Sequence, residues 1–208
     1  MVVPRSSSLL PTLDNYLARL PDGLHSFPDS RAKAHTLRSL IGDPIHPLSR
    51  ESGLPPEIEE LARKPPSADG WVPQVWLSAF HAVALDRVFS GAGGLAAFEE
   101  WSYQRNLGLL RPEIQRKGLD KAGPAALLAA QTAIWPSFYR GTVLRPVDAR
   151  PGRAAFLLSY APHLWPEVSR VALGASLRAA AVLAGATSAT ASAVEESNRT
   201  ARLELRWT

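Results

Sequence analysis

A chain of 208 residues, 46% of them hydrophobic, is long enough to bury a full core. The chain has no cysteine, which excludes disulfides, thiolate metal sites and cysteine nucleophiles and favours a reducing cytoplasm as its location. The formal charge of +4 permits nucleic-acid binding, but the cations are scattered and their densest cluster, residues 111–121, contains acids, so we expect no nucleic-acid partner.

The N-terminus, "MVVPRSSSLLPTLDNYL", lacks the apolar core of a signal peptide. No later run approaches the roughly 18 apolar residues of a membrane span. The heavy use of arginine, alanine and proline is typical of a GC-rich bacterial genome. We therefore expect a cytoplasmic bacterial protein with no membrane span.

Residues 1–70 read as short helices separated by prolines. The predicted helices are Leu13–Leu20, Ser30–Ile41 and Glu57–Ala62. We expect this region to form a helical arm or outer layer on residues 71–208. Residues 71–208 would supply a helical core and a sheet, giving one globular domain overall.

The segment "VPQVWLSAFHAVALDRVFS" is apolar almost all the way round, which predicts a buried central helix over Val75–Phe89. Three glycines follow, at positions 91, 93 and 94, and end it. A second helix is predicted over Leu95–Leu107, with Phe98 and Trp101 on its apolar stripe. Pro124 can begin a third helix, Ala125–Trp135.

After Trp135 the hydrophobic period changes to two, which is typical of strands. We predict strands over Phe138–Leu144 and Ala154–Tyr160 joined by the nine-residue loop "RPVDARPGR", then a helix over Trp165–Ala184. Two further strands, Ser188–Val194 and Thr200–Trp207, complete a hairpin-helix-hairpin. The fold class is therefore α+β, with N-terminal helices packed on a C-terminal four-stranded antiparallel sheet.

Several phrases carry a resemblance to known families: "RLPDGLHSFPDSRAKAHTLRSLI", "WVPQVWLSAFHAVA", "FYRGTVL", "HLWPEVSRVALGASLRAAAVLAGA" and "ARLELRW". Over residues 15–207 the chain resembles an uncharacterised paralogous family of myxobacteria, a domain of unknown function. More distantly, its element order looks like the ligand-sensing superfamily of vinyl-4-reductase-type, haem nitric oxide/oxygen-binding and Bet3-type domains. That resemblance implies a sensory or scaffold domain with a cavity between helices and sheet, often dimeric.

The same resemblance brings no cofactor. The haem branch carries a Tyr-x-Ser-x-Arg signature, which this chain lacks, so haem bound through His81 is not expected. The zinc-type cysteines of some vinyl-4-reductase-type domains are also missing. No histidine has a partner at metal-ligand spacing, and no Gly-x-Ser-x-Gly elbow occurs, so we expect no metal and assign no catalytic residue.

His81 has two interpretations, a ligand contact at the edge of a cavity or a core histidine paired with backbone or Gln74. A second set of aromatic and cationic residues flanks the first predicted hairpin, at its two ends. These residues can hold an anionic or planar ligand, or they are ordinary aromatic packing with an exposed Arg140. The candidate ligand-binding residues are His81, Trp76, Trp135, Tyr139, Arg140, Tyr160, His163 and Trp165.

Three functions remain open. The first hypothesis is a non-enzymatic ligand-binding or regulatory domain, a homodimer by analogy, which holds a small apolar or planar molecule in a cavity of several hundred Å³. The second is an enzyme with an unrecognised pocket around His81 or around Tyr139 and Arg140, in which two titratable groups would meet. The third is a pure protein-interaction module, with no cavity and an exposed apolar patch for a protein partner.

Overall fold

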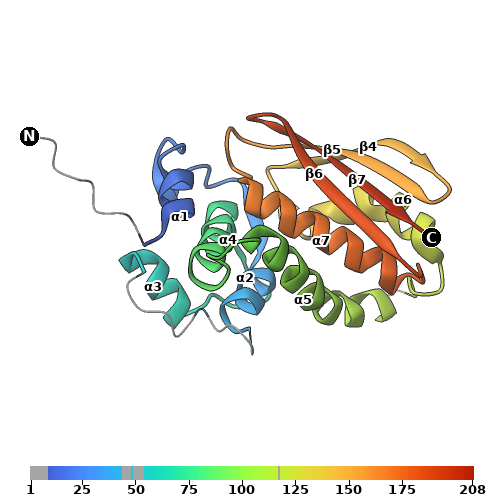
Figure 1. Ribbon diagram of the computed structural model, residues 1–208, viewed down its shortest axis with the longest axis horizontal. Helices are drawn as coiled ribbons and strands as arrows, with labels where there is room; N and C mark the ends of the chain where they lie inside the picture. The colour runs from blue at the N-terminus through green and yellow to red at the C-terminus, as the bar shows by residue number, and fades with distance from the viewer. Residues whose placement is uncertain (1–8, 44–47, 49–53, 117) are drawn as a thin grey trace, which may run out of the picture.

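The computed structural model describes residues 9–43, 48, 54–116 and 118–208 and is an α+β fold with a four-stranded antiparallel sheet at its C-terminal end (Figure 1). This confirms the predicted fold class. The α-helices are α1 (Pro11–Leu17), α2 (Ala34–Ile41), α3 (Pro56–Arg63), α4 (Gln74–Val88), α5 (Gly94–Arg116), α6 (Gly123–Ile134) and α7 (Glu167–Leu183). The short 3-10 helices are η1 (Gly23–His25) and η3 (Trp135–Ser137). The strands are β1 (Arg31–Lys33), β2 (Trp71–Pro73), β3 (Tyr139–Arg140), β4 (Val143–Arg150), β5 (Arg153–Ser159), β6 (Ala189–Ser197) and β7 (Thr200–Trp207).

The C-terminal sheet has the strand order β4-β5-β7-β6, so the two hairpins predicted from the sequence pair through β5 and β7. The alternation predicted for the last strand is present. Ala201, Leu203 and Leu205 are fully buried, whereas Arg206 is exposed. One face of the sheet therefore closes the core and the other faces outward.

The prediction of a nine-residue loop between the first two strands is wrong. β4 continues through Arg150 and β5 begins at Arg153, which leaves a tight turn at Pro151 and Gly152 in place of nine loop residues. Pro146 sits inside β4 next to a register shift before Asp148. Because β4 is an edge strand and a bulge adjoins Pro146, the missing proline N–H is tolerated there.

A second sheet, with the order β2-β1-β3, was not predicted. Its middle strand occupies the start of the segment predicted as the helix Ser30–Ile41, in which only Ala34–Ile41 is helical. The predicted strand Phe138–Leu144 is likewise divided, because β3 pairs with β1 and β4 pairs with β5. Gly141 lies between them with a φ of +71°.

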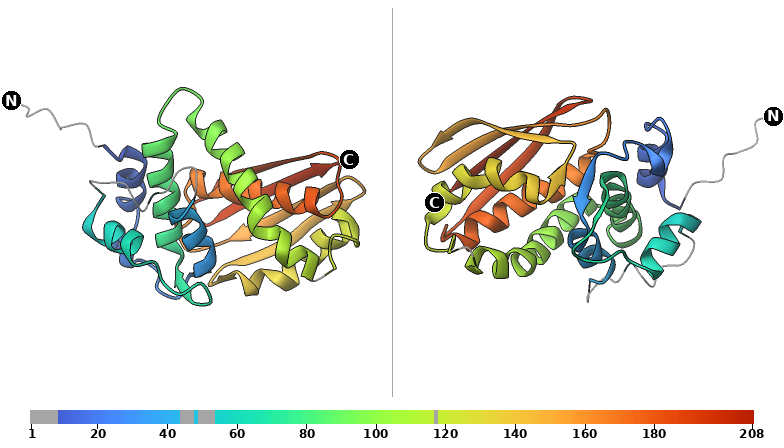
Figure 2. Two further views of the ribbon diagram at one scale, coloured as in Figure 1. Left: turned by 90° about the horizontal axis from the view of Figure 1, so that it is seen from below. Right: turned by 180° about the vertical axis from the view of Figure 1, so that it is seen from behind.

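Helix α7 lies between the four-stranded sheet and helix α5 (Figures 1 and 2). It packs against β6 and β7 on one side and against α5 on the other, with α6 beside it. Gly174 faces β6, where a Cβ placed on it would be in ordinary van der Waals contact with the Ala191 Cβ, at 3.7 Å. The glycine and the many alanines of α7 give this helix a surface of small residues.

Helix α4 is buried along most of its length, as predicted for the central helix. Helix α5 is longer than predicted, because it continues past Leu107 and through Pro112 to Arg116. The N-terminal helices share the main core. Leu13 of α1, Leu37 of α2 and Ile58 of α3 belong to the same buried cluster as Phe80 of α4.

Candidate functional site

A cavity of about 100 Å³ lies between α5, α6 and α7. The N-terminal end of α2, the middle of α4 and the segment from η3 to β3 close its remaining sides. The resemblance implied a cavity between helices and sheet, and the ligand-binding hypothesis expected a volume of several hundred Å³. The observed cavity is smaller, and it lies among helices with β3 of the three-stranded sheet at its wall.

His81 reaches this cavity from α4 and is only 4% exposed. Its Nδ1 lies 3.1 Å from the Ser169 Oγ of α7, and its Nε2 is buried with no hydrogen-bond partner among the described residues. Burial, aided by the positive charge of Arg105, lowers the pKa of His81 to about 3. The imidazole is therefore neutral at physiological pH, with one nitrogen left to hydrogen-bond a bound molecule.

Arg105 brings a positive charge to the same end of the cavity. Its Nη1 donates to the Ser39 Oγ at 2.9 Å and to the Thr36 carbonyl at 3.4 Å, while its Nε has no partner in the described structure. Burial lowers the pKa of Arg105 to about 10, and the charge of Asp43 opposes that shift. Arg105 therefore remains charged at neutral pH and can meet a ligand anion.

Three aromatic rings form one wall of the cavity. Trp135 stacks on Tyr139 with ring centroids 4.3 Å apart, and Tyr139 lies 5.3 Å from Trp165. The Trp135 Nε1 donates to the Thr142 Oγ1 at 3.1 Å, which fixes the indole. Burial raises the pKa of Tyr139 to about 12, so its hydroxyl stays protonated.

The far end of the cavity is apolar. Ile114, Leu127 and Ala180 there belong to a separate small core cluster between α5, α6 and α7. The cavity is thus polar near His81 and Arg105 and aliphatic toward the end of α7. Such a division suits an amphipathic small molecule better than a purely apolar one.

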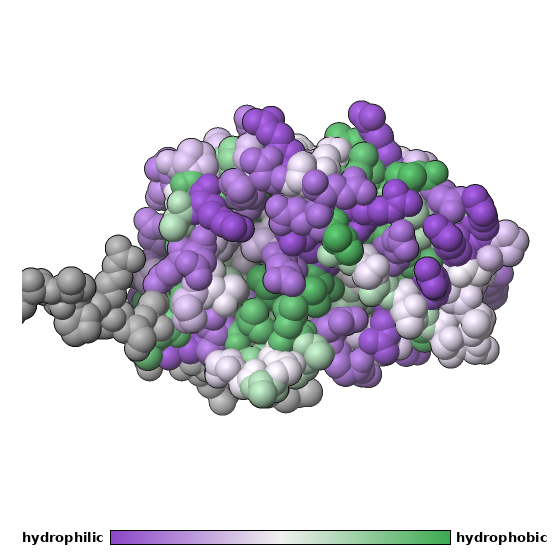
Figure 3. All heavy atoms as spheres, turned by 45° about the horizontal axis from the view of Figure 1, so that its top comes forward, coloured by the Kyte–Doolittle hydropathy of each residue, from purple (hydrophilic) through white to green (hydrophobic). Residues whose placement is uncertain are grey.

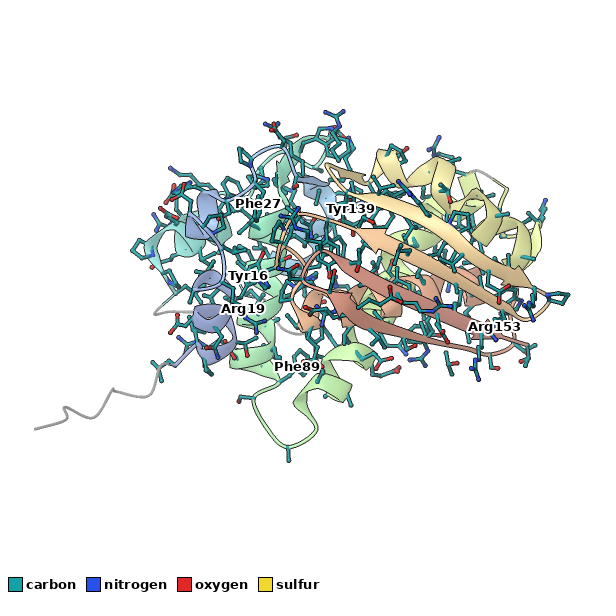
Figure 4. The ribbon with its side chains drawn as sticks, turned by 90° about the horizontal axis from the view of Figure 1, so that it is seen from above. Tyr16, Arg19, Phe27, Phe89, Tyr139 and Arg153 are labelled. Atoms are coloured by element: carbon teal, nitrogen blue, oxygen red, sulfur yellow. The ribbon has the colours of Figure 1, made fainter. Side chains whose placement is uncertain are left out.

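A groove of about 580 Å³ lies on the other side of Trp165, between α1 and the beginning of α7. Tyr160 and His163 line it, and Trp165 lines both the groove and the cavity. Arg170 also lines the groove. Its Nη1 lies 2.7 Å from the Trp165 carbonyl oxygen and 2.7 Å from a Glu195 carboxylate oxygen. Tyr16 and Arg19 also line the groove, and Figure 4 shows these two side chains close together at the same end of the molecule.

The structure brings together four of the eight predicted ligand-binding residues in the cavity: His81, Trp135, Tyr139 and Trp165. Tyr160 and His163 lie in the groove. The aromatic residues before the first hairpin and those after it were expected at opposite ends of that hairpin. They meet instead at Trp165, whose ring centroid lies 6.5 Å from that of Tyr160.

Two predicted residues lie elsewhere. Trp76 is half-buried on α4 and lines neither space. Arg140 is exposed on β3 and stacks over Trp71, with its guanidinium carbon 3.9 Å from the ring centroid. This placement is the one that the alternative interpretation expected, an exposed arginine beside packed aromatics.

Sequence reasoning missed Arg105 and Ser169. Arg105 continues the stripe of Phe98 and Trp101 at helical spacing. The sequence therefore contained the signal that its side chain points toward the core. Ser169 lies in the first turn of α7 and is fully buried, but its contact with His81 joins residues 88 positions apart. The expected partners of His81 were backbone and Gln74, whereas Gln74 instead donates to the Ser78 Oγ at 3.5 Å.

Within the described ranges, no three histidine or acidic side chains are placed to hold a metal ion. None of the described helices has the length and apolarity to cross a membrane. Comparisons of the chain with protein-family models, with curated proteins and with solved structures find no match. The resemblance to the myxobacterial family and to the ligand-sensing superfamily stays a prediction.

Proposed function

We propose that this protein is a ligand-binding domain that encloses a small amphipathic molecule in the cavity between α5, α6 and α7. The apolar or planar body of the ligand would lie against the aliphatic end and the three aromatic rings. An oxygen-bearing, acidic head group would face Arg105 and His81. The observation that carries the proposal is the unpartnered, buried Nε2 of His81, a residue that lines the same cavity as Arg105.

The energetic argument concerns unsatisfied polar atoms. A buried donor or acceptor left without a partner costs roughly 1–3 kcal/mol. His81 and Arg105 line the same cavity. The His81 Nε2 and the Arg105 Nε both lack a hydrogen-bond partner in the described structure. A ligand carboxylate placed between these atoms would accept from both if His81 carried its proton on Nε2, which would leave Nδ1 to accept from the Ser169 hydroxyl.

The alternative of an enzyme has one observation in its favour, the 3.1 Å contact between His81 and the Ser169 hydroxyl. A serine nucleophile needs a neighbouring base with a pKa near the working pH. The pKa of His81 is about 3, and Ser169 is fully buried. Such a histidine is a weak base, so the pair suits hydrogen bonding to a ligand better than acyl transfer.

The test begins with native mass spectrometry of freshly purified protein, to detect a retained small molecule. The protein is then unfolded, stripped and refolded, and octanoate and 1-octanol are titrated by calorimetry. Octanoate should bind at least about tenfold more tightly than 1-octanol, because a charge-assisted bond to arginine contributes more than a neutral one.

A cavity-filling variant supplies the control. Ala172 lines the cavity, so Ala172→Leu should weaken octanoate binding at least about tenfold. Ala129 is exposed on α6 outside the cavity, so Ala129→Leu should leave binding unchanged. Equal binding of octanoate by both variants would contradict the proposal. Turnover of a nitrophenyl ester that Ser169→Ala abolishes would favour the enzyme instead.

A further inference from the structure

The outward face of the four-stranded sheet carries rows of arginines. Directly paired residues on neighbouring antiparallel strands project to the same face. Arg150 of β4 pairs with Arg153 of β5, and Arg153 pairs with Arg206 of β7. Three arginines therefore stand abreast across three strands, with neighbouring strands about 4.8 Å apart.

A second row lies four residues along the strands. Arg145 of β4 pairs with Leu157, Leu157 with Arg202 of β7, and Arg202 with Val194 of β6. Between the two rows lie the only carboxylates of these rungs, Asp148 and Glu204. These rungs thus present five guanidinium groups against two carboxylates.

The carboxylates do not neutralise the face. Asp148 is shared, with its oxygens 3.1 Å from the Arg150 Nε and 3.5 Å from the Arg153 Nε. Glu204 pairs with Arg202 at 3.1 Å. Arg145 and Arg206 make no ion pair within the described residues. Like charges placed directly opposite on neighbouring strands destabilise a sheet. The row of Arg150, Arg153 and Arg206 therefore lowers the stability of the fold, and a bound anion would relieve this repulsion.

Exposed aliphatic side chains accompany the arginines. Among the described residues, four large hydrophobic side chains are exposed, and three of them belong to this sheet: Val143 at 48%, Val147 at 50% and Val194 at 61%. Val143 and Val194 lie on the outward face by their pairing with Ser159 and Arg202. Figure 3 shows this side of the molecule as mostly hydrophilic with smaller hydrophobic areas among the charges.

We propose that the outward face of the sheet docks on an anionic phospholipid surface. Arginines bind lipid phosphates, and neighbouring valines enter the interfacial layer. A nucleic-acid backbone would use the cations but leave the valines in water. A second copy of this face would be repelled, since both carry the same excess of positive charge. The site is separate from the cavity and the groove, and Figure 4 shows Arg153 at the end of the sheet remote from Tyr16 and Arg19.

The experiment measures sedimentation of the full chain with vesicles of phosphatidylserine and phosphatidylcholine, and with vesicles of phosphatidylcholine alone. Binding should require the anionic lipid and should be lost as salt rises from about 0.05 M to about 0.5 M. The triple variant Arg150→Gln, Arg153→Gln, Arg206→Gln should lower partitioning on the order of a hundredfold, at about fivefold for each arginine.

A variant with the same net charge separates this face from a general charge effect. Arg63, Arg111 and Arg116 are exposed on α3 and α5, away from the sheet, so their triple replacement by glutamine should retain most vesicle binding. Equal loss in both triple variants would overturn the proposal. So would binding to duplex DNA or RNA without binding to anionic vesicles, or absence of vesicle binding at low salt.

Folding stability provides an independent readout. Because Arg206 opposes Arg153, Arg206→Thr should raise the melting temperature of the free protein while it weakens vesicle binding. A merely structural role for Arg206 predicts the opposite, a lower melting temperature. That result, with unchanged vesicle binding, would also overturn the proposal.

Discussion

His81 links burial to pH dependence at the scale of one residue. Its pKa is about 3 in the folded chain, against 6.5 for the unperturbed side chain. Below pH 6.5 the unfolded chain gains a proton that the folded chain does not, so stability falls as the pH is lowered through this window. The slope from this group is about 1.4 kcal/mol per pH unit, until the folded pKa is reached.

The variant His81→Gln isolates this contribution, because glutamine can still hydrogen-bond Ser169 but does not titrate. The free energy of unfolding in urea should decline less steeply from pH 6.5 to pH 4.5 in the variant than in the natural protein. His35, whose pKa is also lowered by burial, contributes equally to both proteins and cancels in the difference. Parallel pH profiles would show that His81 is solvated and not buried.

The residue scale is also where sequence reasoning was weakest. Burial of His81 followed from its place in an apolar helix, but its partner did not, because Ser169 comes from a helix 88 residues away. The local candidate, Gln74, lies about two helical turns before His81 and donates to Ser78 instead. Arg140 was favoured for its aromatic neighbours, yet a two-residue strand turns it outward onto Trp71.

Gly141 sets the junction between the two sheets at the scale of elements. It has a φ of +71°, and a Cβ there would lie 2.9 Å from the Asp29 carbonyl oxygen and from two atoms of Ser30. Gly141→Ala should therefore lower the free energy of unfolding by roughly 2–4 kcal/mol, from strain and from steric overlap.

Gly91→Ala is the matched control, since no atom lies within 4 Å of a Cβ there and its φ is not left-handed. It should change the free energy of unfolding by less than about 1 kcal/mol. Chemical denaturation followed by circular dichroism measures both. Equal stabilities of the two variants would mean that the backbone at Gly141 relaxes without cost.

The elements that sequence patterns predicted well are those with long, uninterrupted periodicity. The last strand alternates over eight residues and α4 is apolar on all sides, and both were located within about two residues. The small sheet was missed because its strands have two or three residues, too few to show a period. Helix α5 was cut short at Leu107, although it tolerates Pro112 in its last turns.

The helices and the sheet also divide the chemistry between them. The cavity is built almost wholly from helical side chains, whereas the arginine rows exist only because three strands lie side by side. A cavity between helices depends on how α5, α6 and α7 cross, which no local pattern specifies. The sequence predicted Trp135 and Tyr139 because both lie within a few residues of β3. It predicted Trp165 because that residue follows the first hairpin closely, near Tyr160 and His163.

At the scale of the whole molecule, the N-terminal helices and the C-terminal sheet meet in one core. Leu13, Leu37 and Leu203 are fully buried members of the same cluster, although they come from opposite ends of the chain. The Asp86 carboxylate of α4 also accepts hydrogen bonds from the Thr12 and Leu13 backbone N–H groups at 3.0–3.1 Å, which ties α1 to the central helix. A core shared in this way couples the unfolding of distant segments.

We therefore expect one cooperative unfolding transition. Six tryptophans distributed between Trp71 and Trp207 report on tertiary packing, and far-ultraviolet circular dichroism reports mainly on the helices. The two urea denaturation curves should coincide, and Leu37→Ala in α2 should move both midpoints together, with a loss of about 2–4 kcal/mol. If Leu37→Ala shifted only an early dichroism phase and left the fluorescence midpoint in place, the N-terminal helices would unfold separately from the sheet.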